Sequence, residues 1–438
     1  MSSFSLFQEL LPAIFEKKLG FSSFFKANKS RYEDLDIFEL CEQIVAFNGD
    51  SANLLLAEQI MDKYQLLDKV GKLEFFECLL NNYDLDIAEI QTAINAYEQE
   101  QNYENFHSFV SYSEPKRQEL LRRLNLASSG TRKLVKMRED LFSFIQLRAE
   151  FKKVDFDFQH LFRSWFNRGF LVMRPIDWNT PAHILEKVIS YESVHEIGSW
   201  DELRSRLEPE DRKCFAFFHP SMLDDPLIFV EVALTHEISS SIEEVLNHNR
   251  EIVPKDTANT AIFYSISNCH RGLKGVSFGT FLIKQVAQHL KQDCENLQYF
   301  CTLSPILGFT KWLKEQGQSD YIQVFQEKFE QHEVDSLKEQ TLTLLAKYFL
   351  EAKNHSGEPY DPVARFHLGN GAKLSRLNWC ANMSPKGIVQ SLGLMVNYLY
   401  DLDKVEANHE AYTVNKEIIV DSNIKQLLKN KKKDSIDE

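Results

Sequence analysis

The hydrophobic pattern of this chain changes once, and that change limits its fold more than any other feature. From residue 1 to about 155, apolar residues recur at third and fourth positions and glycines are few, as in amphipathic helices. After about residue 165, β-rich apolar runs alternate with helical ones. We therefore predict an all-helical domain over residues 1–155, followed by a mixed-sheet α/β domain over residues 156–438.

One helix of the first part is marked by a single apolar stripe. Leu134, Met137, Leu141 and Phe144 recur at the spacing of one helix face. A stripe of this kind is more often core packing or a subunit interface than a surface for a cofactor. We therefore expect this stripe to lie in the core of the helical domain or in a contact between subunits.

The second part contains four candidate strands and a helix between the last two. The strands are predicted at 214–219, 226–235, 260–267 and 297–303, and the helix at 280–293. Strand, helix and strand in succession form a parallel crossover, whereas the earlier strands follow one another closely enough to pair antiparallel. The sheet should therefore be mixed.

Charge and cysteine content limit the partners and the compartment. The formal net charge is −14, which predicts no basic footprint for a nucleic acid, and no apolar run approaches the roughly 20 residues of a membrane helix. The seven cysteines are widely spaced without a Cys-x-x-Cys pair, so we expect reduced thiols and no zinc site. The start, MSSFSLFQELLPAIF, lacks the basic region of a secretory signal. These features favour the cytoplasm.

A glycine-rich link, NCHRGLKGVSFGT (268–280), joins the third predicted strand to its helix. Glycines let the backbone turn sharply, and exposed amides at a helix N-terminus attract phosphate. The segment predicts a pyrophosphate cradle, although such turns also occur for packing alone. The candidate residues are Arg271, Gly272, Lys274, Gly275 and Gly279.

Two further residues could carry chemistry. Ser304 ends the last predicted strand directly before Pro305, at the strand end where α/β sheets place ligands. By local pattern alone it is an ordinary turn residue. His367 lies in RFHLGNGAKL (365–374), predicted as a strand or turn, and its imidazole suits proton transfer, although a lone histidine is more often structural. No constellation for a metal or a cysteine nucleophile accompanies them.

Several ordered segments of the sequence together resemble malonyl-CoA decarboxylases. They cover most of residues 155–400. The segments are FFHPSMLDDPLIFVEVALT (217–235), TAIFYSISNCHRGLKGVSFGTFLIKQVAQHL (260–290), TLSPILGFTKWL (302–313), PVARFHLGNGA (362–372) and LNWCANMSPKGIVQSLGLMVNY (377–398).

The resemblance implies a helical N-terminal domain used in homo-oligomer contacts and a catalytic domain of the acetyltransferase (GNAT) type. In that fold two parallel strands splay apart around the pantetheine arm. The catalytic serine and histidine of the family fall on Ser304 and His367, and a tyrosine near the acyl pocket falls on Tyr400. Asn370 and Tyr400 are candidates for orienting the pair, with packing and turn roles as the alternative.

The chain departs from the family pattern at two positions. Ser277 stands where some members carry an acidic residue in the glycine-rich turn, so a carboxylate at that position is not required here. Leu307 replaces the second proline of the usual Ser-Pro-Ile-Pro-Gly-Phe, which predicts a looser loop after the serine. We still include Ser277 among the expected substrate-binding residues.

The implied reaction converts malonyl-CoA to acetyl-CoA and CO2. Loss of CO2 leaves an electron pair that delocalises into the thioester carbonyl, so no cofactor is needed. Ser304 and His367 would bind the carboxylate and deliver a proton to Cα, with His367 as general acid. Two alternatives are an acyl-CoA N-acyltransferase on the same fold and a malonyl-CoA sensor that lacks the chemistry.

Overall fold

The computed structural model describes residues 32–46, 50–222, 224–276, 282–330 and 333–434. The chain divides into two compact units. Unit 1 comprises residues 1–167 with 270–276, and unit 2 comprises residues 168–269 with 277–438. Within the described ranges, no helical segment combines the length and the hydrophobicity of a membrane span.

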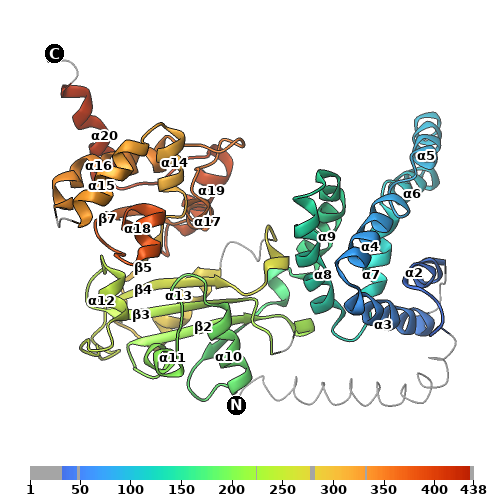
Figure 1. Cartoon of the computed structure of the whole chain (residues 1–438), viewed down its shortest axis with the longest axis horizontal. Helices are drawn as coiled ribbons and strands as arrows, with labels where there is room; N and C mark the ends of the chain where they lie inside the picture. The colour runs from blue at the N-terminus through green and yellow to red at the C-terminus, as the bar shows by residue number, and fades with distance from the viewer. Residues whose placement is uncertain (1–31, 47–49, 223, 277–281, 331–332, 435–438) are drawn as a thin grey trace. The chain divides into compact units, whose positions relative to one another are not determined.

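Unit 1 is helical, which confirms the prediction for this part of the fold (Figure 1). All four residues of the predicted stripe are buried on one helix, Gly130–Ile145. Aromatic rings fill the space beneath it, with Phe76 packed against Phe144 and Phe151. The helices are α2 Ile37–Ala46, α3 Asp50–Leu66, α4 Lys69–Asn81, α5 Ile87–Gln99, α6 Tyr103–Tyr112, α7 Lys116–Leu124, α8 Gly130–Ile145, η1 Ala149–Phe151, α9 Lys152–Trp165 and, from residues 270–276, η4 Arg271–Leu273.

Unit 2 is built on one mixed sheet, as predicted. Its strand order is β1-β2-β3-β4-β5-β8-β6, and β7 also pairs with β8. The neighbours are antiparallel except for β4 and β5, which run parallel. The strands are β1 Val172–Ile176, β2 Arg212–Phe218, β3 Ile228–Thr235, β4 Thr260–Asn268, β5 Tyr299–Thr302, β6 Ser304–Pro305, β7 Lys373–Asn378 and β8 Met395–Leu399.

Helices flank this sheet, and α13 makes the predicted crossover from β4 to β5. The later helices, coloured orange to red in Figure 1, gather beside β7, which α16, α17 and α20 contact. The helices are η2 Arg168–Phe170, α10 Ala182–Tyr191, α11 Trp200–Leu207, η3 Pro220–Met222, α12 Ile242–Leu246, α13 Leu282–Asp293, α14 Phe309–Glu315, α15 Ser319–Glu330, η5 Val334–Leu337, α16 Lys338–Leu350, α17 Pro362–Gly369, α18 Pro385–Ser391, α19 Val405–Asn415 and α20 Ser422–Asp434.

The parallel strands β4 and β5 separate before β4 ends. Their pairing runs from Thr260–Tyr299 to Phe263–Thr302, whereas β4 continues to Asn268. The N–H of Leu303 still donates to the carbonyl of Phe263 in β4, and the chain then turns away, so that Ser304 pairs with Val396 of β8 instead. This divergence leaves one side of β4 without a strand partner, and the candidate site lies there.

The predicted conformation around His367 is wrong. Residues 365–374 were expected to form a strand or turn, but His367 lies in the helix α17. Asp361 caps this helix by accepting the N–H of Ala364, and Pro362 occupies its first turn, where its fixed φ suits a helix. Gly371, with φ of +80°, follows the end of the helix. The Asp-Pro start and Gly end were readable signals of a helix.

Candidate active site

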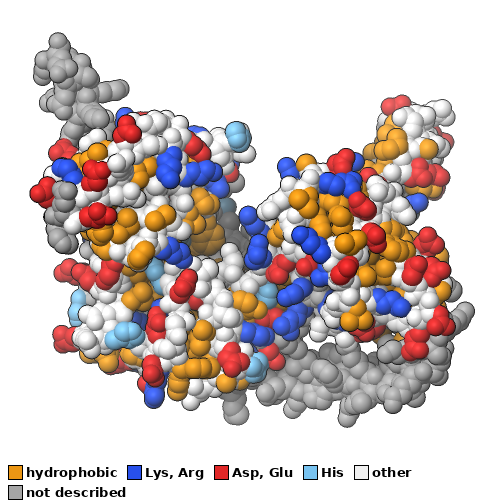
Figure 2. Space-filling view, viewed as in Figure 1, with side chains coloured by type: hydrophobic (Ala, Val, Ile, Leu, Met, Phe, Trp, Pro, Cys, Tyr) orange, Lys and Arg blue, Asp and Glu red, His pale blue; other side chains and the backbone are white. Residues whose placement is uncertain are grey.

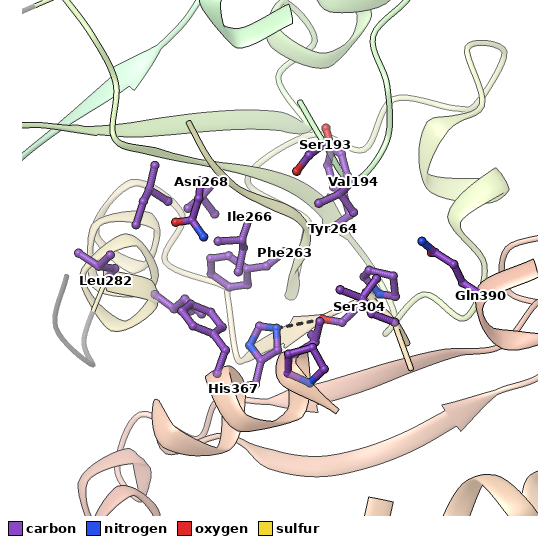
Figure 3. A pocket seen from close by; sticks show the side chains of 18 of the residues that line it. Ser193, Val194, Phe263, Tyr264, Ile266, Asn268, Leu282, Ser304, His367 and Gln390 are labelled. Carbon is purple, nitrogen blue, oxygen red and sulfur yellow. Dashed lines mark hydrogen bonds between the residues drawn. The ribbon is translucent and has the colours of Figure 1, made fainter. Parts of the chain in front are cut away.

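A cavity of about 380 Å³ opens in unit 2 where β4 and β5 separate (Figure 3). Phe263, Ile266 and Asn268 of β4 form one wall, and Ser304 and His367 lie on the wall that comes from later in the chain. The remaining lining residues are Ser193, Val194, Ile228, Val230, Tyr264, Leu282, Ile283, Pro305, Leu307, Pro362, Val363, Phe366, Asn382, Lys386 and Gln390.

The structure brings Ser304 and His367 together, although 63 positions separate them in the sequence. Ser304 Oγ lies 3.1 Å from His367 Nε2, the contact drawn as a dashed line in Figure 3. The serine hydroxyl donates to Thr302 Oγ1 at 2.8 Å, and Thr302 Oγ1 also accepts the backbone N–H of Tyr398. Both members of the pair line the cavity.

His367 is fixed on one face of its ring and at its second nitrogen. Its ring stacks on Tyr398, with centroids 4.6 Å apart, and its Nδ1 lies 2.7 Å from the hydroxyl of Tyr400. Burial lowers the pKa of His367 to about 3, because an imidazolium would be poorly solvated there. Burial also raises the pKa of Tyr400, so its phenol keeps the proton. The resting imidazole is therefore neutral.

These contacts fix the direction of the hydrogen bonds. The proton of Ser304 points to Thr302, so the serine oxygen accepts from Nε2–H of His367. Tyr400 then donates to the bare Nδ1 of the same ring. The result is a chain from Tyr400 through His367 and Ser304 to Thr302, in which each donor has one acceptor.

The predicted tyrosine therefore stands behind the histidine and does not line the cavity. Tyr400 is 2% exposed, and its hydroxyl contacts His367 rather than the open space. Asn370 is the C-cap of α17, and its side chain donates to the carbonyl of Phe366 at 2.7 Å. Asn370 thus ends the helix that carries His367, as in the turn role weighed from the sequence.

Residues 270–276 of the glycine-rich segment are grouped with unit 1, whereas the residues that line the cavity belong to unit 2. A Cβ on Gly272 would lie 2.0 Å from the carbonyl oxygen of Val135 in α8, so close packing alone requires this glycine. Gly275 has φ of +79°, a conformation that other residues rarely adopt. Close packing thus accounts for Gly272, and the backbone conformation of the turn accounts for Gly275.

The cations of that segment are exposed, as a phosphate contact would need. The side chains of Arg271 and Lys274 both face solvent. Ser277 and Gly279 lie outside the described residues.

Sequence reasoning missed two polar residues of the site. Thr302 lies two positions before Ser304 in an extended segment, so the alternation of side chains in a strand could have identified it. Lys386 of α18 donates from Nζ to the carbonyls of Ser193 and Val194 at 2.8 and 3.3 Å and so holds a wall of the cavity. Nothing in its local pattern distinguishes this lysine. Among the described residues, no cluster of His, Cys, Asp or Glu is placed to hold a metal.

Known proteins resemble this chain over most of its length. Residues 169–438 match the Malonyl-CoA decarboxylase C-terminal domain family, and residues 83–166 match the Malonyl-CoA decarboxylase N-terminal domain family. A mitochondrial malonyl-CoA decarboxylase of Anser anser anser is 35% identical over 344 residues, which are 70% of this chain and 68% of that protein. The protein of the same name from Rattus norvegicus is 34% identical, over 72% of this chain and 71% of its own.

Solved structures agree with these matches. A malonyl-CoA decarboxylase from Rhodopseudomonas palustris is 46% identical with a TM-score of 0.85, covering 89% of this chain and 98% of that one. Another from Agrobacterium vitis is also 46% identical, with a TM-score of 0.84 over 90% of this chain and all of the other.

Proposed function

The chain belongs to the malonyl-CoA decarboxylase family, and from this premise we propose that it cleaves malonyl-CoA to acetyl-CoA and CO2 in the cavity beside Ser304. The observation that carries this proposal is the contact between Ser304 and His367 at the wall of a largely apolar cavity. In such a site the serine hydroxyl can turn from Thr302 to a substrate carboxylate and donate to it without a bulk of water around them.

The apolar lining favours the cleavage itself. The negative charge is concentrated on the carboxylate at the start and becomes spread over the thioester enolate as CO2 leaves. A poorly hydrated cavity lined by Val230, Phe263, Ile266 and Phe366 disfavours the concentrated charge more than the dispersed one. The chain's own side chains thus orient the substrate and exclude water.

The serine hydroxyl is the group we assign to proton delivery. With the carboxylate gone, Cα carries an electron pair on the face where Ser304 held the CO2 group. The Ser304 O–H bond breaks and a C–H bond forms, which leaves a serine alkoxide that accepts from Nε2–H of His367. Water that enters behind the departing CO2 returns a proton to the serine, and the hydroxide left behind takes up a proton from solvent, so that one solvent proton is consumed in each turnover. Since the resting imidazole is neutral, His367 acts as a donor to the serine oxygen and not as a standing imidazolium.

The direct test is turnover by the purified protein. Incubation with malonyl-CoA should produce acetyl-CoA and CO2 in equal amounts, with no added amine. Mass spectrometry of the acyl-CoA pool and a CO2 assay measure both products. Transfer of the malonyl group to an added amine without CO2 release would support the N-acyltransferase alternative, and binding without turnover would support the sensor.

Arg271 and Lys274 are proposed to attract the phosphates of CoA. Replacing both with alanine is expected to raise the KM for malonyl-CoA about tenfold with little change in kcat, because a phosphate contact binds substrate and transition state alike. The salt dependence of KM should also become weaker. Lys69→Ala, an exposed cation on α4, is the matched control. A KM equal to that of the control would move the phosphate site elsewhere.

The proposal includes a homo-oligomer assembled through the helical segment, residues 1–155. Figure 2 shows hydrophobic side chains on the hairpin of α5 and α6, at the upper right. Ile87 is 70% exposed and Phe106 is 48% exposed there. An apolar surface of this kind favours a protein contact. Light scattering that gives the mass of one chain would contradict it.

We further propose that the protein lies in the cytoplasm and acts in fatty acid metabolism. All seven cysteines are free thiols, as suits a reducing compartment, and malonyl-CoA is a carbon donor of fatty acid synthesis. The curated relatives named above are mitochondrial proteins. Cell fractionation distinguishes the two compartments.

A further inference from the structure

Asp361 lies between the two chain segments that carry the proposed catalytic pair. Its side chain is 1% exposed. Oδ1 accepts the backbone N–H of Ala364 at 2.8 Å, which caps α17. Oδ2 accepts the backbone N–H of Leu307 at 3.2 Å and the hydroxyl of Tyr348 at 3.1 Å. One buried carboxylate thus joins three separate parts of the chain.

The two backbone donors lie close to the reacting side chains. Leu307 follows Ser304 by three residues, and Ala364 precedes His367 by three. The 3.1 Å contact between Ser304 and His367 therefore spans two segments whose backbones are held by the same side chain. A shift of either segment would change the distance and angle of that contact.

The hydroxyl of Tyr348, the third donor, can reach Asp361 because residue 308 is a glycine. A Cβ on Gly308 would lie 2.5 Å from the Tyr348 hydroxyl, so any other residue would displace that hydroxyl from Asp361. Tyr348 is fully buried, and burial together with the nearby carboxylate raises the pKa of its phenol. The hydroxyl therefore remains a donor.

The groups that donate hydrogen bonds to Asp361 are uncharged: two backbone amides and a tyrosine hydroxyl. Burial raises the pKa of this carboxyl, and the hydrogen bonds from Ala364, Tyr348 and Leu307 act in the opposite direction. Across the described residues, no lysine or arginine forms an ion pair with it. If the segment after Ser304 moved away, the buried carboxylate would lose the hydrogen bond from Leu307. The free energy of that loss favours the observed position of the segment.

We propose that Asp361 is a positioning residue of the decarboxylation, which sets the Ser304–His367 contact by tying the backbone N–H of Leu307 to the N-terminus of α17. The inference rests on the proposed roles of Ser304 and His367. It also assigns a role to the amide of Leu307, which a proline at this position would lack.

The test removes the tie from each side. Asp361→Asn can still accept the N–H of Ala364, but its amide group cannot accept from Leu307 and Tyr348. We expect kcat for malonyl-CoA to fall about 10–100-fold with KM within about twofold of wild type. Leu307→Pro removes the donor, and Leu307→Val keeps it as the control for the side chain. Asp86→Asn, at the N-cap of α5, controls for a changed cap elsewhere.

The double variant decides whether the two residues act through one bond. If they do, Asp361→Asn combined with Leu307→Pro should lower kcat no further than the worse single variant, and the shifts in urea midpoint should be equally non-additive. Additive effects on both quantities, or wild-type kcat in Asp361→Asn, would overturn the positioning role. If the wild type itself does not release CO2, the proposed function fails, while non-additive urea midpoints would still establish the tie.

Discussion

Replacing Ser304 with alanine is expected to lower kcat for malonyl-CoA by about 10²–10⁴-fold, the range that a positioned proton donor contributes. His367→Asn should cause a loss of similar size, because it removes the ring that contacts the serine oxygen at 3.1 Å. Binding of acetyl-CoA, measured by calorimetry, should remain within a few fold of wild type. Steady-state kinetics on malonyl-CoA give the change in kcat.

The double variant should be scarcely slower than the worse of the two single variants, since the serine and the histidine act as one unit. Ser143→Ala on α8 and His107→Asn on α6 are exposed controls that should keep wild-type activity. Full activity in both Ser304→Ala and His367→Asn would remove this pair from the reaction. A loss of acetyl-CoA binding in parallel with kcat would show that the pair serves the fold or the cavity shape instead.

The sequence predicted four of the eight strands, β2 to β5, because each is a continuous apolar run. The runs at 226–235 and 260–267 correspond to β3 at Ile228–Thr235 and β4 at Thr260–Asn268. Burial on both faces leaves such segments few alternatives. The helix at 280–293 was equally clear, because three of its apolar residues recur at the helical period and α13 buries them.

The conformation of His367 was harder to predict because α17 is only eight residues long. Two turns give too few apolar positions to separate a helical period from a strand. The signals at its ends, Asp361 with Pro362 and the later Gly371, carry the information instead. In a short element, capping residues thus decide more than the hydrophobic pattern does.

The contacts of the site depend on long-range pairing that a single sequence does not encode locally. Ser304 reaches His367 because β6 leaves β4 and pairs with β8. The tie from Asp361 to Leu307 depends on the same arrangement. The resemblance to a family indicated Ser304 and His367, whereas the contacts of Thr302 with Ser304 and of Asp361 with Leu307 follow from the long-range arrangement.

The buried, neutral state of His367 predicts a specific change of stability with pH. The pKa of this histidine is about 3 in the folded protein, against about 6.5 in an unfolded chain. Between these values the unfolded state binds one more proton than the folded state, so the free energy of unfolding falls as the pH falls. The loss is about 1.4 kcal/mol per pH unit. His367→Asn cannot bind this proton and should not show the loss.

Urea unfolding of wild type and His367→Asn at about pH 6, 5 and 4 measures the effect. At pH 7 the variant should be less stable, because it leaves Tyr400 without an acceptor. The difference in the free energy of unfolding between wild type and variant should then narrow by about 1.4 kcal/mol per pH unit as the pH falls. From pH 6 to pH 4 this amounts to about 2.8 kcal/mol. His107→Asn, an exposed change, should give a curve parallel to that of wild type.

The comparison isolates His367 because other shifted groups are present in both proteins. Burial also lowers the pKa of His195 to about 3, and it raises the pKa of Glu231 to about 8. Their contributions to the pH dependence cancel in the difference between wild type and variant. A gap that stays constant from pH 6 to pH 4 would mean that the folded imidazole takes up a proton as readily as the unfolded one. In that case His367 would rest as a cation in acid, and the assignment of a neutral Nε2–H donor to Ser304 would fail.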